Sequence, residues 1–563
     1  MASVALPVTF VVAVALAMAS CASVGPAVAP PVVVVPELVD EGPTLDRGAP
    51  VALTAVDGTA LTLRSLRVRA VVDEPLAFTE LEMVFDNPEG RVLDGQLAVT
   101  MPPGARITRF ARAAGPNWIE AEVVPRRAPY ESLLRGEPRQ DPAMLAGAAG
   151  ERFVARVDGI TAREPTRVVV AYVQELRGRS EPYRVALAGL PRLRELSLSL
   201  SSRTAVSVGG EPALLKATTQ GQVNRYTDIT PGRDLTLHFS GPRELGLRRD
   251  DMVVARISPV PHDHPDPIDS LTVLFDTSAS QAASFDVQIE RLAQVIAAID
   301  RHVAGDIPLR VMAFDQGVEV VFEGRLSQFD RAPLKALRER GALGASNLAG
   351  ALKAVASRGA RRYQRLLLIT DGMVTAGAPG LEVVRAEASR LLDAGYVRVD
   401  AMVEGGMHDS AVLGALAAVS PDHPGLVLHA ALSPDATARR LIRGVVADVE
   451  VAVKGGAWVY PQRFPALQAG DDVLVYAGLE RGDAEAGEDF AVQLSGGEIN
   501  REFAVPLVET ASPLLQDAWS GARASWLIDQ ANTQCATTQG GLPGERLVCE
   551  GWRRQALDWS AEH

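Results

Sequence analysis

The clearest chemical signal in the 563-residue sequence is a set of five oxygen-bearing side chains. They are expected after strands of a predicted sheet or at the start of a helix that follows it. Asp276 follows the apolar strand 271–275, and Asp371 follows the apolar strand 366–370. The carboxyl ends of strands in a doubly wound sheet line one crevice, so residues far apart in sequence converge there. The predicted ligand set is Asp276, Ser278, Ser280, Ser346 and Asp371.

Two carboxylates and three hydroxyls form an all-oxygen donor set. Such hard ligands suit Mg²⁺ or another hard divalent cation such as Mn²⁺ or Ca²⁺, and the set offers nothing specific for zinc. A lone Asp-x-Ser-x-Ser is also typical of a helix-capping turn after a strand. The three parts in order, each after a strand or at a helix start, favour the metal site.

The elements that must position these residues follow a regular alternation. A helix is predicted where Phe285, Ile289, Leu292, Ile296 and Ile299 recur at helical spacing. Short apolar strands are predicted at 271–275, 308–313, 366–370, 398–403 and 425–429. Further helices are predicted near 329–340, 347–358, 380–394, 409–418 and 433–447. This alternation predicts an α/β, doubly wound, mostly parallel sheet covered on both faces.

Residues 269–447 resemble a von Willebrand factor type A (vWA) domain, whose metal-ion-dependent adhesion site begins with Asp-x-Ser-x-Ser. The resemblance implies that the three serines contact the ion directly, and that Asp276 and Asp371 act directly or through water. The family usually has threonine where Ser346 stands, and serine keeps the oxygen. Neutral inner ligands leave the ion electron-poor, so the resemblance implies that an Asp or Glu of a protein partner completes its coordination.

The region before the α/β segment is predicted to be rich in strands. Between residues 51 and 176, short alternating apolar runs separated by turn residues predict antiparallel β structure, with a helical insert at 128–134 and 141–145. Period-two patterns continue through 184–260. The ordered series Phe85-Asp86-Asn87-Pro88, Met101-Pro102-Pro103-Gly104, Tyr130, 141–145, 153–157 and 167–172 resembles the vault/inter-α-trypsin (VIT) domain. That resemblance implies a β-rich fold with no assigned chemistry.

The end of the chain returns to period two over 455–508, followed by an amphipathic helix at 512–530. The order VIT, vWA and β-rich tail resembles inter-α-trypsin inhibitor heavy chains. The chain lacks their Asp-Pro-His processing signal, so their glycosaminoglycan-carrier function is not transferred. Cys535 and Cys549 enclose a short loop, and an exported location would permit a disulfide between them. Two free thiols remain the alternative.

The amino terminus predicts export. Residues 4–20 are almost continuously apolar and end at Cys21 in Met18-Ala19-Ser20-Cys21, which resembles a bacterial lipoprotein signal with Cys21 as the lipidated residue. An uncleaved signal anchor is the alternative, since about 17 apolar residues is the lower limit for spanning a bilayer. The Pro-, Ala- and Val-rich segment after Cys21 predicts a semi-rigid tether.

Composition excludes several classes of protein. The 69 acidic and 56 basic residues give a formal net charge of -13, which argues against nucleic-acid binding. With 47% hydrophobic and 22% charged residues, a disordered tail, a collagen-like rod and a multi-span membrane protein are excluded. No P-loop or G-x-S-x-G nucleophile elbow is present, so no enzyme is expected. His262 and His264 form an H-x-H pair, for which an exposed linker is favoured over a metal site.

The sequence therefore predicts a multidomain protein with a β-rich VIT domain, an α/β vWA domain and a β-rich tail with a helix. The predicted segments are a signal peptide (1–21), a tether (22–48), the VIT domain (49–180), a β-rich connecting region (181–268), the vWA domain (269–447) and the tail (448–563). The leading hypothesis is an envelope-anchored, metal-dependent adhesion or protein-interaction module. The competing hypothesis is a structural scaffold of an envelope complex whose metal site is only stabilising.

Overall fold

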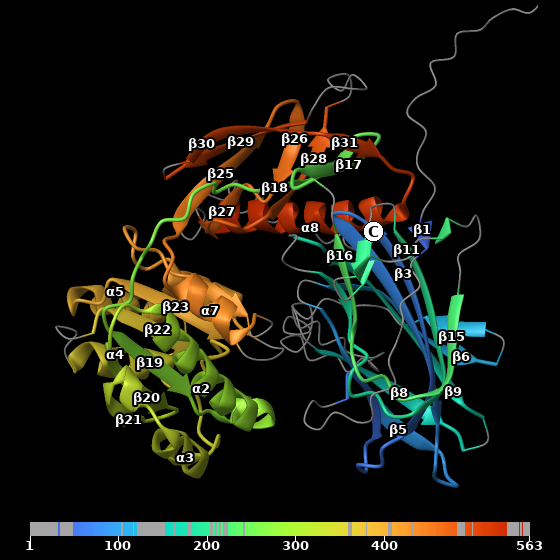
Figure 1. The fold of residues 1–563 in the computed structure, drawn as a ribbon, viewed down its shortest axis with the longest axis horizontal. Coiled ribbons are helices and arrows are strands. Elements are labelled where there is room, and N and C mark those ends of the chain that lie inside the picture. Colours follow the sequence, from blue (N-terminus) through green and yellow to red (C-terminus); the bar gives the residue numbers. More distant parts are fainter. Residues whose placement is uncertain are drawn as a thin grey trace, which may run out of the picture.

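The computed structural model contains one α/β unit and two strand-rich units, one above it and one to its right in Figure 1. It describes residues 32–33, 49–102, 105–115, 117–120, 152–162, 164–177, 182–202, 206–208, 211–212, 216–217, 223–239, 242–358, 363–378, 380–403, 408–429, 432–480, 490–497, 499–536, 551 and 554–555. Within these residues, no helix is both long and apolar enough to cross a membrane. The signal peptide, Cys21 and the predicted insert at 128–145 lie outside them.

The N-terminal β unit, built from strands between residues 32 and 239, is a large twisted sheet backed by smaller ones. Across the large sheet the strands are β14 (Lys216–Ala217), β1 (Val32–Val33), β11 (Leu193–Ser202), β3 (Thr62–Asp73), β4 (Leu76–Asp86), β9 (Thr166–Glu175), β6 (Arg106–Ala114) and β7 (Asn117–Glu120), with β15 (Val223–Ile229) also on β11. The smaller sheets are β2 (Val51–Ala55), β5 (Leu93–Thr100) and β8 (Arg152–Ile160), and β10 (Tyr183–Val185), β16 (Leu235–Phe239), β12 (Val206–Val208) and β13 (Glu211–Pro212).

The alternation predicted from the sequence is visible in this unit. Leu66, Val68 and Ala70 of β3 are buried in a core shared by the sheets, because alternate residues of a strand face the same side. The large sheet is mixed: β3 pairs antiparallel with β4 and parallel with β11. The predicted connecting region 181–268 is divided between two units. β11 and β15 belong to this large sheet, whereas the later residues 245–257 pair with strands near the end of the chain.

The α/β unit, residues 268–445, contains the predicted alternation of strands and helices. The sheet order is β21 (Val318–Arg325), β20 (Pro308–Phe314), β19 (Leu271–Asp276), β22 (Arg365–Ile369), β23 (Arg398–Val403) and β24 (Val427–His429), parallel except at β21. One face packs on α2 (Phe285–His302), α3 (Arg331–Arg340) and α7 (Pro434–Leu441). The other packs on α4 (Leu348–Ser357), α5 (Leu381–Asp393) and α6 (Ser410–Ala417). After β19 the chain continues to α2 on one face of the sheet, and after β22 it continues to α5 on the other face. The ends of these two strands therefore form a topological switch point.

Two local elements differ from expectation. The antiparallel edge strand β21 was not predicted, because its half-exposed residues lack the continuous apolar run of the central strands. The helix predicted at 433–447 ends at Leu441. Gly444 instead approaches the linker before the sheet, where its N–H donates to the His264 carbonyl at 2.5 Å, and β25 (Val446–Val453) follows.

The tail unit is a pair of packed sheets with a helix on one side. One sheet orders β26 (Gly456–Tyr460), β28 (Val473–Leu479), β18 (Met252–Ile257), β17 (Leu245–Arg249) and β31 (Leu507–Glu509). The other orders β27 (Arg463–Leu467), β25, β29 (Phe490–Gly496) and β30 (Ile499–Val505). Helix α8 (Pro513–Ala536), which covers the predicted helix, packs on β18 and β26 and also on β4 and β9 of the N-terminal β unit.

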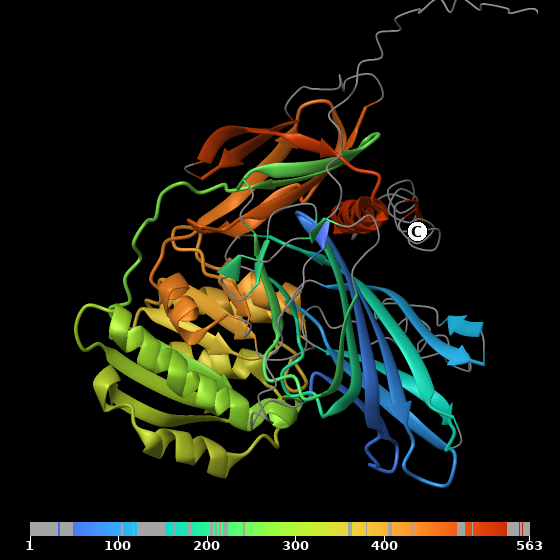
Figure 2. The same cartoon turned by 45° about the vertical axis from the view of Figure 1, so that its right-hand side comes forward.

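The α/β unit is inserted into the tail unit. β17 and β18 precede it in sequence, yet β18 pairs with β28 and β17 with β31, both of which follow it. Figure 2 shows the green segment that leaves the tail unit and enters the α/β unit. The two connections are joined, since the Asp266 N–H donates to the Ile442 carbonyl at 2.9 Å and Arg398 donates to the Asp266 carboxylate at 2.8 Å. The exposed His262 and His264 belong to the first connection.

A buried ion pair joins the tail unit to the N-terminal β unit. The side chains of Arg256 on β18 and Glu74 between β3 and β4 are each 1% exposed and lie 2.8 Å apart. The other guanidinium nitrogens of Arg256 donate to the carbonyls of Arg243 and Pro242. Nearby, Thr510 donates to Asp73 at 3.0 Å. Because an unpaired buried charge is costly, these contacts hold the two units in one arrangement.

Replacing Arg256 with Met should lower the free energy of unfolding by about 3–5 kcal/mol, because Glu74 would keep a buried charge without a partner. Denaturant titration of the full chain measures the change. Lys335 and Glu339 form an exposed ion pair and provide the control, since Lys335→Met should cost no more than about 0.5 kcal/mol. Equal effects of the two substitutions would show that the Arg256 pair does not hold the junction.

Candidate metal centre

The structure brings the predicted ligand residues together at the switch point. Asp276 is the last residue of β19, and Asp371 lies two residues after β22, the strand that pairs with β19. Ser346 lies two residues before α4, and the loop that contains it forms a β-bridge between Gly344 and Ser278. The three sequence segments therefore form one cluster at the carboxyl ends of the strands.

Asp276 is the centre of this cluster. Its side chain is buried, and its residue is 1% exposed. Oδ1 accepts a hydrogen bond from the Ser278 N–H at 2.8 Å. Oδ2 accepts from the hydroxyls of Thr370 at 2.5 Å and Ser346 at 3.4 Å. These neutral donors fix the carboxylate in one orientation, yet within the described part of the chain no Arg, Lys or His forms an ion pair with it.

The serine hydroxyls line the opening of the cluster. The Oγ atoms of Ser278 and Ser280 lie 3.1 Å apart. Adjacent ligands of an octahedral ion with bonds of about 2.1 Å are separated by about 3 Å, so this spacing suits two ligands of one Mg²⁺. Ser278 is buried whereas Ser280 is exposed, so the cluster reaches the surface there. Gln281 donates to the Ser280 hydroxyl at 3.2 Å.

Ser346 and Asp371 are held by backbone contacts of their own. The Ser346 N–H donates to the Thr375 hydroxyl at 2.8 Å, and the Ser346 carbonyl accepts from the Thr375 and Ala376 N–H groups. Asp371 Oδ1 accepts from the Met373 N–H at 2.9 Å. Among the described residues, none donates to Asp371 Oδ2, so this atom is available to a ligand. The 371–376 turn and the loop before α4 are therefore braced against each other.

The donor set fits a hard divalent cation. Burial raises the pKa of the Asp276 carboxyl in the metal-free protein, and the negative charge of Asp371 raises it further. A buried carboxylate beside a second carboxylate is costly unless a cation compensates for the charge. Among the described residues, no group of three or more His, Cys, Asp or Glu side chains is placed to hold a metal.

Sequence reasoning missed two positioning residues. Thr370 contacts Asp276 from the end of β22 and also accepts from the Gly372 N–H at 3.1 Å. Arg340 donates to the Thr277 hydroxyl at 3.0 Å and to Asp315 at 2.8 Å. These bonds tie the end of α3 to residues 277–280 after β19, which we call the metal loop. Thr370 could have been found from the sequence, because it places a hydroxyl directly before the predicted ligand Asp371. The contacts of Arg340 depend on tertiary packing and had no such signal.

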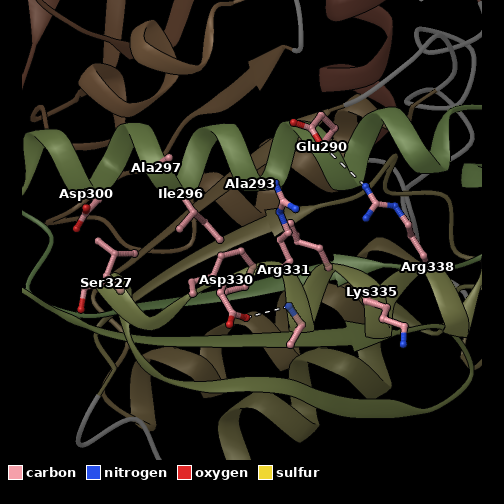
Figure 3. Close-up of a pocket in the computed structure, with 14 residues that line it drawn as sticks. Glu290, Ala293, Ile296, Ala297, Asp300, Ser327, Asp330, Arg331, Lys335 and Arg338 are labelled. Atoms are coloured by element: carbon pink, nitrogen blue, oxygen red, sulfur yellow. Dashed lines mark hydrogen bonds and ion pairs between the residues drawn. The ribbon is translucent and has the colours of Figure 1, made fainter.

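A cleft of about 900 Å³ lies elsewhere on the α/β unit, between α2 and α3 (Figure 3). Its apolar floor includes Ile296 and Phe329, and its rim carries both acidic and basic side chains such as Glu290 and Arg338. None of the five predicted metal ligands lines it. The cleft is therefore separate from the metal centre.

The predicted disulfide stays a prediction. Cys535 belongs to α8, whereas Cys549 lies outside the described residues. Lipidation of Cys21 also stays a prediction, because Cys21 lies outside the described residues.

No family model and no protein of curated function matches this chain. Similar solved structures include mussel byssus proximal thread matrix protein 1 with a zinc-occupied MIDAS motif, at 21% identity over 35% of this chain and 52% of that one, TM-score 0.25. A von Willebrand factor type A structure from Catenulispora acidiphila has 17% identity over 53% and 79%, TM-score 0.28. BatB from Bacteroides thetaiotaomicron has 12% identity over 30% and 96%, TM-score 0.23.

The structural neighbours thus include vWA proteins, and the chain spans about half the length of the byssus protein. The zinc in that byssus structure occupies the motif of that protein, whereas the present sequence predicted a preference for harder ions.

Thr370→Val should weaken Mg²⁺ binding by about 10- to 100-fold, because the substitution removes the hydroxyl that orients Asp276. Isothermal titration of Mg²⁺ into the full chain measures the affinity. The matched control is Thr437→Val on α7. This substitution removes a buried hydroxyl that has no hydrogen-bond partner among the described residues. Unchanged affinity in Thr370→Val would mean that Asp276 needs no support from β22.

Asp276→Asn should stabilise the metal-free protein at neutral pH and abolish the response to Mg²⁺. A carboxyl whose folded-state pKa is raised destabilises the fold above that pKa, and this penalty disappears as pH falls through it. The advantage of the Asn variant in EDTA should therefore shrink toward acidic pH. Denaturant titrations across pH, with EDTA or Mg²⁺, test this, and an Asn variant less stable than wild type in EDTA would refute it.

Proposed function

We propose that this chain is an envelope-anchored, divalent-metal-dependent protein-interaction or adhesion protein with a vWA-type metal site. The observation that carries the proposal is the cluster around Asp276, a buried carboxylate without an ion-pair partner among the described residues. Hydroxyl ligands surround it, and the cluster opens to solvent at Ser280. A site that served only stability would not need this opening.

Each residue has a distinct role in the proposed interaction. Ser278, Ser280 and Ser346 hold the cation with neutral oxygens, while Asp276 and Asp371 supply the negative charge. When bound, the cation provides an electrophilic position for an Asp or Glu carboxylate of the partner. Thr370 orients Asp276, and Arg340 fixes the metal loop against α3. The short contacts among these residues organise the site before a partner arrives, which lowers the entropic cost of binding.

The other units fit a non-enzymatic role in the cell envelope. Part of the series that resembles a VIT domain lies in strands of the N-terminal β unit, since 153–157 belong to β8 and 167–172 to β9, and this supports a VIT-like domain. The lipobox-like Cys21 and the tether support a lipoprotein that holds the α/β unit away from a membrane. The partner is a protein that presents Asp or Glu, and the net charge of -13 disfavours nucleic acid.

A structural scaffold is the second candidate, and the buried junction between the tail unit and the N-terminal β unit favours it. The Arg256–Glu74 pair and the Thr510–Asp73 hydrogen bond are typical of units that keep one arrangement. In this alternative, the N-terminal β unit and tail unit assemble the complex, and the cation only stabilises the α/β unit. Cation removal would then lower stability but leave the assembly intact.

Immobilised full chain should capture envelope proteins in Mg²⁺ and release them in EDTA, because the cation bridges the two proteins. Peptides that contain Asp should compete with capture, whereas the same peptides with Asn should not. Ser278→Ala should abolish capture, while Ser357→Ala, which removes an exposed hydroxyl of α4, should leave it unchanged. Capture that persists in EDTA and in Ser278→Ala would favour the scaffold.

A further inference from the structure

Leu343 is an apolar side chain held in solvent beside the metal centre. It is 87% exposed, although its neighbour Ala342 is 8% exposed. It lies in the loop between α3 and α4, one residue before Gly344, which forms the β-bridge with Ser278. Bridged residues lie about 5 Å apart, and consecutive Cα atoms are about 3.8 Å apart. The Leu343 backbone is therefore within about 9 Å of a predicted metal ligand.

The loop that presents Leu343 is fixed at both ends and in the middle. At its start, the Gly341 N–H donates to the Leu337 carbonyl at 3.1 Å, with Gly341 at φ 70°. In the middle, the Gly344 carbonyl accepts from the Ala279 N–H at 2.7 Å. At its end, the Asn347 N–H donates to the Asp315 carbonyl at 2.9 Å. These three hydrogen bonds hold the loop backbone in the conformation that exposes Leu343.

Side chains reinforce this arrangement. Arg340, the last residue of α3, donates to Asp315 and to the metal-loop residue Thr277. Gly344 packs so closely on Asp315 that a Cβ at this position would lie 2.5 Å from the Asp315 Cβ. A larger residue would therefore displace the loop. Singly exposed apolar residues are normal on protein surfaces. Leu343 differs from them because its fixed loop is bridged to the predicted ligand Ser278.

From these contacts we propose that Leu343 is a partner-specificity residue of the metal centre, which packs against an apolar side chain near the partner's metal-binding Asp or Glu. The proposal rests on the proposed function. Alternate residues of an extended segment face the same side, and two residues span about 6.6 Å, so the apolar side chain is expected two positions from the acidic one. The preferred partner segment therefore combines an acidic residue and an aliphatic or aromatic residue at this spacing.

A peptide array provides the probe. Its peptides carry a central Asp with either Leu or Ser two positions away, and a parallel set carries central Asn. Labelled wild-type full chain in Mg²⁺ should retain the Asp peptides with Leu about tenfold more strongly than those with Ser, because burying a leucine side chain adds affinity of this order. Leu343→Ser should remove this preference but keep Mg²⁺-dependent retention of the Asp peptides.

Val56 supplies the matched control, since it is 82% exposed and directly follows β2 in the N-terminal β unit. Val56→Ser should bind as wild type does, and Ser278→Ala should bind none of the peptides. A Leu preference that survives Leu343→Ser, or that wild type lacks, overturns the role of Leu343 alone. Absence of Mg²⁺-dependent, Asp-selective retention by wild type, or its survival in Ser278→Ala, overturns the proposed function and this inference together.

Discussion

The α/β unit is organised around one electrostatic constraint, which is the buried carboxylate of Asp276 beside the carboxylate of Asp371. Hydrogen bonds from Ser278, Thr370 and Ser346 orient Asp276 but supply no positive charge. A carboxylate buried in this way raises its pKa or requires a cation. The sheet places this charge at the ends of β19 and β22, where the chain departs to opposite faces and leaves a crevice. The rest of the α/β unit holds that geometry.

The arrangement of the units connects this site to the rest of the chain. The α/β unit is inserted between β18 and β25, so both of its connections enter the tail unit together. Asp266 joins those connections through Arg398 and the Ile442 carbonyl. The buried Arg256–Glu74 pair joins the tail unit to the N-terminal β unit. The α/β unit is therefore attached through paired connections to two β units that are joined to each other.

Local patterns predicted much of the α/β unit, because continuous apolar strands and helical periodicity are local properties. They placed the central strands, and they placed the five predicted ligand positions at one edge of the sheet. They missed β21, whose residues are half exposed, and the pairing of β18 with β28, since strand partners distant in sequence leave no local pattern. Arg340 was missed for the same reason, because its role depends on which side chains the fold brings near Thr277. Thr370 differs, since its position directly before Asp371 was a local signal that was not used.

The central claim is that one hard cation binds at the cluster of Asp276 and the three serines. The most direct measurement is the electron paramagnetic resonance signal of free Mn²⁺ titrated with the full chain. The account predicts one tightly bound Mn²⁺ per chain, displaced by excess Mg²⁺ and absent when Ser278 and Ser346 are both replaced by Ala. No bound Mn²⁺, or equal binding by that double variant, would contradict it.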